Sequence, residues 1–128
     1  MRISEAAAAA GTTAKTLRFY ESIGLMPEQP RTSSGYREYP PEAVQRAAFI
    51  RRSRAAGLTL EQTHQILRLH DTGTTPCGHV REQLEEQLGA IDRQIAELTA
   101  LRAEVAQHYR AASAGPDGCD TGEICSYL

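Results

Sequence analysis

The sequence predicts a mainly α-helical protein that consists of a head of short helices followed by one long C-terminal helix. Two observations lead to this prediction. Glycines divide the first 60 residues into short helical segments, and apolar residues recur at helical spacing in the second half. The 128 residues, 41% of them hydrophobic, suffice for one compact domain with an appendage. No apolar run approaches the roughly 18 residues that cross a membrane, so we expect a cytoplasmic protein with no membrane partner.

Two short helices are expected at the start of the head. Residues 3–10 are rich in alanine, and Gly11 closes this helix as glycine does at many helix ends. Thr12 or Thr13 caps a second helix over residues 14–21. Together the two segments form a helix-turn-helix pattern.

A hairpin is expected over residues 30–39, because Ser34-Gly35 supplies a tight turn between two extended arms. Its second arm, residues 36–39, has too few apolar side chains for a core strand. Such an arm is better suited to lying along the surface of a partner.

Two further helices complete the head. Pro41 suits the first turn of a third helix over residues 41–56. Thr59 and Gln62 have the spacing of a capping box, which predicts a fourth helix over residues 60–69.

The longest helix is expected from Cys77 to residue 111 or 112. Its apolar residues alternate steps of four and three, with Leu101 beside the one break at Arg102. The apolar seam consists of Leu84, Leu88, Ile91, Ile95, Leu98 and Val105. Because a head of this size cannot bury such a seam, we expect an obligate homodimer paired in a coiled coil. The alternative is a helix that folds back on its own head.

The net charge of −2 conceals two opposite halves. Residues 1–60 hold nine basic and five acidic side chains, whereas residues 61–128 hold five basic and eleven acidic ones. A basic head can meet the phosphates of a nucleic acid while the acidic remainder stays clear of them.

Four segments carry a close resemblance to a known family. They are Ile3-Ser4-Glu5-Ala6-Ala7 followed by Gly11, Thr16-Leu17-Arg18-Phe19-Tyr20-Glu21 with Gly24-Leu25, Ser34-Gly35-Tyr36-Arg37-Glu38-Tyr39, and Ala56-Gly57-Leu58-Thr59-Leu60-Glu61. These segments closely resemble the head of the MerR family of transcriptional regulators. The long helix and the cysteine-bearing terminus resemble the metal-responsive branch of that family, so the resemblance covers nearly the whole chain.

The resemblance implies a winged helix-turn-helix DNA-binding domain over residues 1–70. It further implies a hinge and an antiparallel coiled-coil dimerisation helix over 71–112, and a C-terminal metal-binding loop over 113–128. Such homodimers bind a promoter whose spacer is too long, and effector binding leads them to bend and untwist that DNA so that RNA polymerase can use it. An enzyme is not expected, because the sequence lacks a phosphate-binding glycine-rich loop and a convincing Ser/His/Asp arrangement.

The resemblance also implies which residues of the head contact double-stranded DNA. The second helix would present Lys15, Thr16, Arg18 and Tyr20 to the major groove, and the wing would grip phosphates through Tyr36, Arg37 and Tyr39, helped by Arg31 and Arg54. For the three tyrosines, packing of the wing against the head remains the alternative.

Three cysteines are candidates for a metal site. Within one protomer the long helix holds Cys77 roughly 50 Å from Cys119 and Cys125. In an antiparallel pair, Cys77 of one protomer can instead meet Cys119 and Cys125 of its partner, with His79 as a fourth ligand or His108 in its place. Three thiolates suit a soft divalent ion: Zn(II) or Hg(II) is expected, and Cd(II) or Pb(II) also fits. Members of the family that sense monovalent copper carry serine at the position of Cys77.

The chain departs from the family pattern in its terminal loop. Related sensors place the first loop cysteine near Ala112, about a heptad before Cys119, so the site here uses a longer loop or is built differently. A second reading is a regulator that senses oxidants or electrophiles, in which Cys119 and Cys125 form a disulfide.

Overall fold

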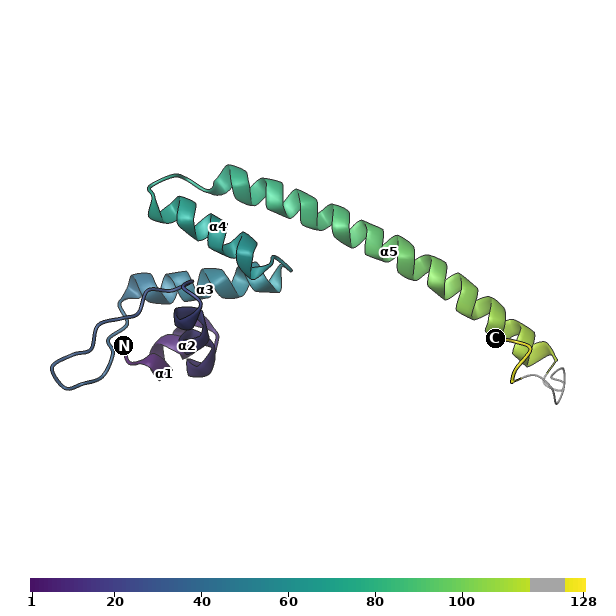
Figure 1. The fold of residues 1–128 in the computed structure, drawn as a ribbon, viewed down its shortest axis with the longest axis horizontal. Helices are drawn as coiled ribbons and strands as arrows, with labels where there is room; N and C mark the ends of the chain where they lie inside the picture. Colours follow the sequence, from purple (N-terminus) through teal and green to yellow (C-terminus); the bar gives the residue numbers. More distant parts are fainter. Residues whose placement is uncertain (116–123) are drawn as a thin grey trace. The chain divides into compact units, whose positions relative to one another are not determined.

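The computed structural model describes residues 1–115 and 124–128, and this part of the chain contains five helices and no strand (Figure 1). The helices are α1 (Ile3–Ala10), α2 (Ala14–Ser22), α3 (Pro41–Ala55), α4 (Leu60–Asp71) and α5 (Cys77–Ala114). The mainly helical fold is thus confirmed, and the predicted bounds differ from the observed ones by three residues at most.

The chain divides into two compact units, Met1–Leu84 and Glu85–Leu128. The sequence places the end of the head near residue 70, whereas the first unit also contains the start of α5. One reason is a hydrogen bond of 2.6 Å from the Gln62 side-chain amide on α4 to Gln83 Oε1 on α5.

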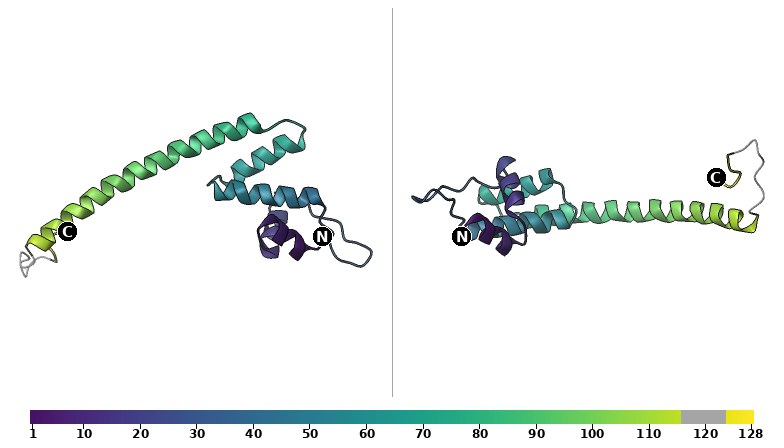
Figure 2. Two further views of the ribbon diagram at one scale, coloured as in Figure 1. Left: turned by 180° about the vertical axis from the view of Figure 1, so that it is seen from behind. Right: turned by 90° about the horizontal axis from the view of Figure 1, so that it is seen from below.

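The core of the first unit lies where α1 packs against both α2 and α3, in the purple-to-teal part of the ribbon (Figure 2). Small alanines on α1 let it approach α3 closely. The largest fully buried side chains of the unit are Leu17, Leu25, Met26, Tyr39, Ile50, Thr63 and Ile66. Helix α4 joins α3 partly through a buried hydrogen bond of 2.6 Å between the hydroxyls of Ser53 and Thr63.

Local capping signals act as the sequence predicts. Gly11 has a φ of 76° and ends α1, and the Thr13 hydroxyl accepts a hydrogen bond of 3.2 Å from the Thr16 amide at the start of α2. The predicted capping box of α4 is present, with Thr59 and Gln62 exchanging both hydrogen bonds.

Replacing Gly11 with alanine is expected to lower the free energy of unfolding by about 2 kcal/mol, measured by urea unfolding. The left-handed backbone would be strained, and the added Cβ would lie 2.9 Å from Arg51 Nε. That nitrogen donates to the Ala10 carbonyl, at 3.2 Å, so the contact between α1 and α3 would be disturbed.

Gly24→Ala is the matched control, because Gly24 has a φ of 80° and nothing within 4 Å of an added Cβ. It should cost only the backbone strain, about 1 kcal/mol. Equal losses in the two variants would mean that the Arg51 contact contributes nothing.

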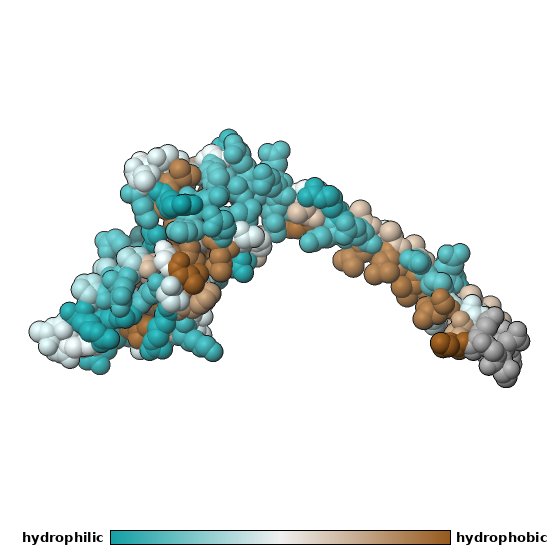
Figure 3. Space-filling view, in the orientation of Figure 1, coloured by the Kyte–Doolittle hydropathy of each residue, from teal (hydrophilic) through white to brown (hydrophobic). Residues whose placement is uncertain are grey.

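In the second unit, the apolar seam of α5 is unpacked. Leu88, Leu98 and Tyr109 are 63%, 65% and 70% exposed, and α5 as a whole contains no buried residue. Figure 3 shows hydrophobic side chains gathered along one side of this helix. No described helix is long and apolar enough to cross a membrane.

Candidate nucleic-acid interface and metal ligands

Helix α2 has an anchored face and a solvent face. Leu17 and Tyr20 are buried in the core of the head, whereas Lys15 and Arg18 are exposed and Thr16 is half-buried. The two cations lie three residues apart, which places them on one face of the helix. Helix α2 therefore presents positive charge to solvent at the positions that the sequence assigns to DNA.

The loop between α2 and α3 forms the predicted turn. The Thr32 amide donates to the Tyr36 carbonyl at 2.7 Å, and the Gly35 amide donates to the Thr32 carbonyl at 2.9 Å. Among the described residues, one isolated antiparallel bridge joins its two arms, between Arg31 and Arg37. Arg31 also donates from Nη1 to the Gly35 carbonyl, at 2.8 Å. We call residues 30–39 the wing.

The aromatic ring of Tyr36 contacts the side chain of Arg2, the residue just before α1. The Arg2 guanidinium is 4.0 Å from the centroid of this half-buried ring. Such cation–π contacts stabilise the position of a ring, so Arg2 helps to hold the tip of the wing against the head.

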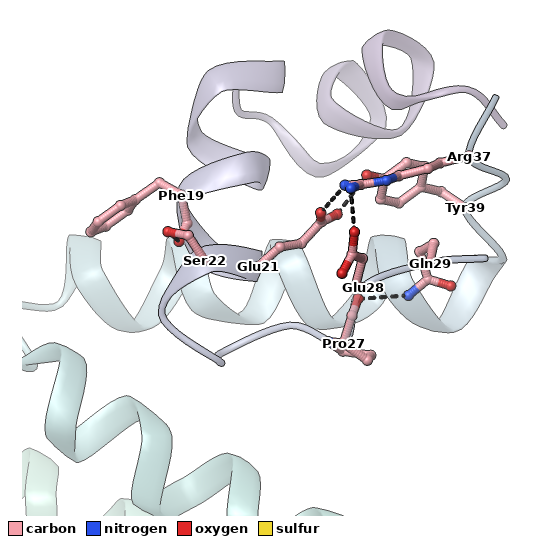
Figure 4. Close-up of polar contacts among 8 residues, drawn as sticks. All are labelled: Phe19, Glu21, Ser22, Pro27, Glu28, Gln29, Arg37 and Tyr39. Carbon is pink, nitrogen blue, oxygen red and sulfur yellow. Dashed lines mark hydrogen bonds and ion pairs between the residues drawn. The ribbon is translucent and has the colours of Figure 1, made fainter. Parts of the chain in front are cut away.

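The base of the wing meets α2 through a cluster of charged and polar groups (Figure 4). Arg37 forms ion pairs with Glu21 through Nη1 and with Glu28 through Nη2, and the Tyr39 hydroxyl donates to Glu21 Oε1 at 2.5 Å. The Glu21 side chain is 6% exposed, although it is a carboxylate. Burial, with the hydrogen bond to Glu21, raises the pKa of Tyr39 above its usual value of 10.0, so Tyr39 stays a neutral donor at physiological pH.

Two of the nine residues that the sequence assigns to DNA are placed differently. Tyr39 is 1% exposed and Tyr20 is 7% exposed, so both side chains are buried inside the head, as the packing alternative expects, and a DNA contact by either one stays a prediction. Both rings belong to the hydrophobic core that also contains Ala43, Ala47 and Ile50 of α3. Arg54, by contrast, is exposed, with Nη1 donating to the Leu58 carbonyl at 2.6 Å.

A cleft of about 550 Å³ lies between α2 and the wing. It is lined by Ile3, Arg18, Glu21, Ser22, Glu28, Arg31, Gly35, Tyr36 and Arg37. The cleft thus gathers four of the predicted DNA-contacting residues, whereas Lys15, Thr16 and Arg54 are not among its lining residues.

Sequence reasoning missed the two carboxylates of the cleft, Glu21 and Glu28. A signal for Glu21 was available: it lies four residues after Leu17 and therefore on the buried face of α2, where an acid needs a partner. No comparable pattern marks Glu28, whose side chain is 72% exposed.

The candidate metal ligands are distributed along the chain. Cys77 is exposed as the first residue of α5, and Cys125 is exposed in the C-terminal segment, whereas Cys119 lies outside the described residues. His79 is half-buried, with no hydrogen-bond partner for its buried Nε2 in the described structure, and His108 is half-buried farther along α5. Within residues 1–115 and 124–128 of a single chain, no group of three such ligands is placed to hold a metal ion.

Comparison with family models gives two matches. Residues 1–69 match the model described as a MerR HTH family regulatory protein, and residues 44–108 match the model described as MerR, DNA binding. A probable heavy metal-dependent transcriptional regulator of Haemophilus influenzae is 35% identical over 117 residues, which are 91% of each chain.

Two solved structures extend the similarity to three dimensions. The transcription regulator PbrR691 from Ralstonia metallidurans CH34, in complex with lead(II), is 35% identical with a TM-score of 0.78, covering 100% of this chain and 96% of that one. HiNmlR, a MerR family regulator bound to promoter DNA and lacking the sensor domain, is 26% identical with a TM-score of 0.60, covering 89% of each chain.

Proposed function

We propose, since the chain belongs to the MerR family of helix-turn-helix transcriptional regulators, that it binds promoter DNA as a homodimer and activates transcription when it binds a soft divalent metal ion. As a member of a family of regulators it is not an enzyme. The observation that carries the DNA-binding part is that exposed Arg18 on α2 lines one cleft with the wing residues Arg31 and Tyr36, while Lys15 is exposed on the same helix. HiNmlR, the relative solved on promoter DNA, supports the same part.

The homodimer is supported by the exposed seam of α5. Eight large apolar side chains from Leu84 to Tyr109 are at least 38% exposed, and a helix with such a stripe is stabilised by a partner that covers it. A second copy of α5 presents the complementary seam, and we propose that the two helices pair antiparallel.

The metal-responsive part is supported by the donor set and by the relative solved with lead(II). Cys77 is exposed at the start of α5 and Cys125 is exposed after its end, so an antiparallel pair brings thiols of two protomers to each end of the coiled coil. We assign the site to Cys77 of one protomer and to Cys119 and Cys125 of the other, with His79 as a fourth ligand. Thiolate donors favour Zn(II), Hg(II), Cd(II) or Pb(II) over hard ions such as Mg²⁺.

In this proposal, activation is a change in the orientation of the two DNA-binding heads relative to each other on the promoter. A metal ion that joins the loop of one protomer to the start of α5 in the other ties the coiled coil to a head. Bending and untwisting DNA costs several kcal/mol, which phosphate contacts of the basic heads must offset. RNA polymerase then responds to the distorted promoter and not to a direct contact with the protein.

The test is a promoter-reporter assay across a panel of Zn(II), Hg(II), Cd(II), Pb(II) and Cu(I), with diamide and hydrogen peroxide as oxidants. We expect induction by at least one soft divalent ion and none by the oxidants. Induction by oxidants alone, with a reversible disulfide between Cys119 and Cys125, would support the thiol-based redox regulator instead.

A further inference from the structure

We propose that Glu21 is a positioning residue that fixes the wing relative to α2 by binding Arg37 and Tyr39. In this role the Arg37 guanidinium pairs with the Glu21 carboxylate and does not contact a DNA phosphate. The inference rests on the proposed DNA binding. It identifies Glu21 as the group that sets the positions of the proposed DNA-contacting residues Arg18, Arg31 and Tyr36 relative to one another. It replaces the role in phosphate contact that the sequence assigns to Arg37.

Both oxygens of the Glu21 carboxylate are bound by side chains of the wing. Its Oε1 accepts the Tyr39 hydroxyl at 2.5 Å, and its Oε2 is paired with Arg37 Nη1, so both oxygens are used by the wing. At 6% exposure the side chain has almost no water to replace these partners. If Arg37 left to meet a phosphate, a buried carboxylate would lose its cation, which is costly.

The cluster of Glu21, Glu28 and Arg37 carries a net negative charge. Arg37 carries one positive charge between the two negative charges of Glu21 and Glu28, and Tyr39 is neutral. The cluster is therefore net negative on the wall of the cleft that Arg18 and Arg31 also line. A net negative cluster repels phosphate, so its contribution to DNA binding has to be geometric.

Glu21 connects the wing to a helix that is anchored in the core of the head. Leu17 and Tyr20 anchor α2 in the core, and Glu21 follows them directly on the same helix. The wing has a single isolated bridge between its arms, and it meets the start of the chain through the Arg2–Tyr36 contact, a backbone hydrogen bond of 2.7 Å from Tyr39 to Met1, and an ion pair of 2.6 Å between the Met1 ammonium and Glu38. The Glu21 cluster is its charged attachment to α2, and it sets the position of Arg31 and Tyr36 relative to Arg18.

The experiment measures binding of the full-length Glu21→Gln variant, by fluorescence anisotropy, to a DNA duplex that the wild type has selected from a randomised pool. Glutamine can still accept the Tyr39 hydrogen bond but cannot pair with Arg37. We expect binding to weaken roughly tenfold, even though the substitution removes a negative charge near DNA. Glu5→Gln, which removes an exposed acid of α1 outside the cluster, is the matched control and should bind as well as the wild type or better.

A double-mutant cycle separates the two roles of Arg37. For a positioning residue, Glu21→Gln combined with Arg37→Gln should bind no more weakly than the weaker single variant, and the salt dependence of binding should keep its slope. Tighter binding by Glu21→Gln, additive losses in the double variant, or a slope reduced by about 0.9 for each Arg37 lost would overturn the proposal.

Two further measurements guard against a variant that fails to fold. Glu28→Gln alters only the exposed member of the cluster, and we expect it to weaken binding about threefold; tighter binding would contradict the proposal. In the DNA-free protein, hydrogen exchange at the Thr32 and Tyr39 amides should be faster in the Glu21→Gln and Glu28→Gln variants than in the wild type. This arm needs no DNA, so unchanged exchange overturns the inference, whereas a wild type that selects no duplex overturns the proposed function.

Discussion

Leu98→Glu is expected to convert the protein from a dimer into a monomer at micromolar concentration. Leu98 lies in the middle of the α5 seam and is 65% exposed in the single chain. In a two-fold dimer the substitution occurs twice, so it removes two buried leucines at about 2 kcal/mol each and desolvates two carboxylates at several kcal/mol each. Sedimentation velocity measures the change in mass directly.

Ala100→Glu is the matched control, because residue 100 is two positions away and about 200° around the helix from Leu98. It should remain a dimer of the same mass as the wild type. A wild type that sediments as a monomer, with a mass that Leu98→Glu leaves unchanged, would mean that no coiled coil forms.

The helices could be predicted from the sequence because their limits are set by nearby residues. Gly11 ends α1, Thr59 and Gln62 cap α4, and Pro41 begins α3, and each of these signals acts within four residues. The length of α5 follows in the same way from an uninterrupted helical period. Local signals of this kind need no knowledge of what packs against the helix.

The Glu21 cluster could not be predicted, because it depends on contacts between residues far apart in the chain. Arg37 lies 16 residues after Glu21, and Tyr39 lies 18 after it. Alternation along the wing indicates which residues share a face, but it does not fix which face meets α2. The sequence therefore leaves two roles open for Tyr39, a phosphate contact or packing against the head, and the structure buries its side chain.

The metal site illustrates a different limit. The proposed ligands come from two protomers, and the described residues of one chain hold no group of three such ligands. Cys119 lies outside the described residues, and Cys77 and Cys125 belong to the first and second compact units respectively. The ligand set accordingly remains a prediction about the dimer, and a test has to use dimers in which each protomer can be altered separately.

Mixed dimers of one Cys77→Ser protomer and one Cys125→Ser protomer are expected to recover a single tight metal site, although each variant alone has none. A thiolate lost from either position should weaken metal binding on the order of 100-fold or more, since even partners outside the ligand set cost up to that amount. In the mixed dimer both substitutions fall in one of the two sites. The other site keeps Cys77 from one chain and Cys119 and Cys125 from its partner.

Dimers purified through two different affinity tags allow this comparison, with Hg(II) or Cd(II) binding followed by thiolate-to-metal charge-transfer absorbance. Doubly tagged dimers with Cys77→Ser in both protomers are the control and should bind no ion tightly, at an unchanged sedimentation mass. A site built within one protomer would leave the mixed dimer as inactive as this control, because each chain would then lack one of its own ligands. Recovery of one ion per dimer requires that the thiols come from both chains, which is the geometry that an antiparallel α5 pair imposes.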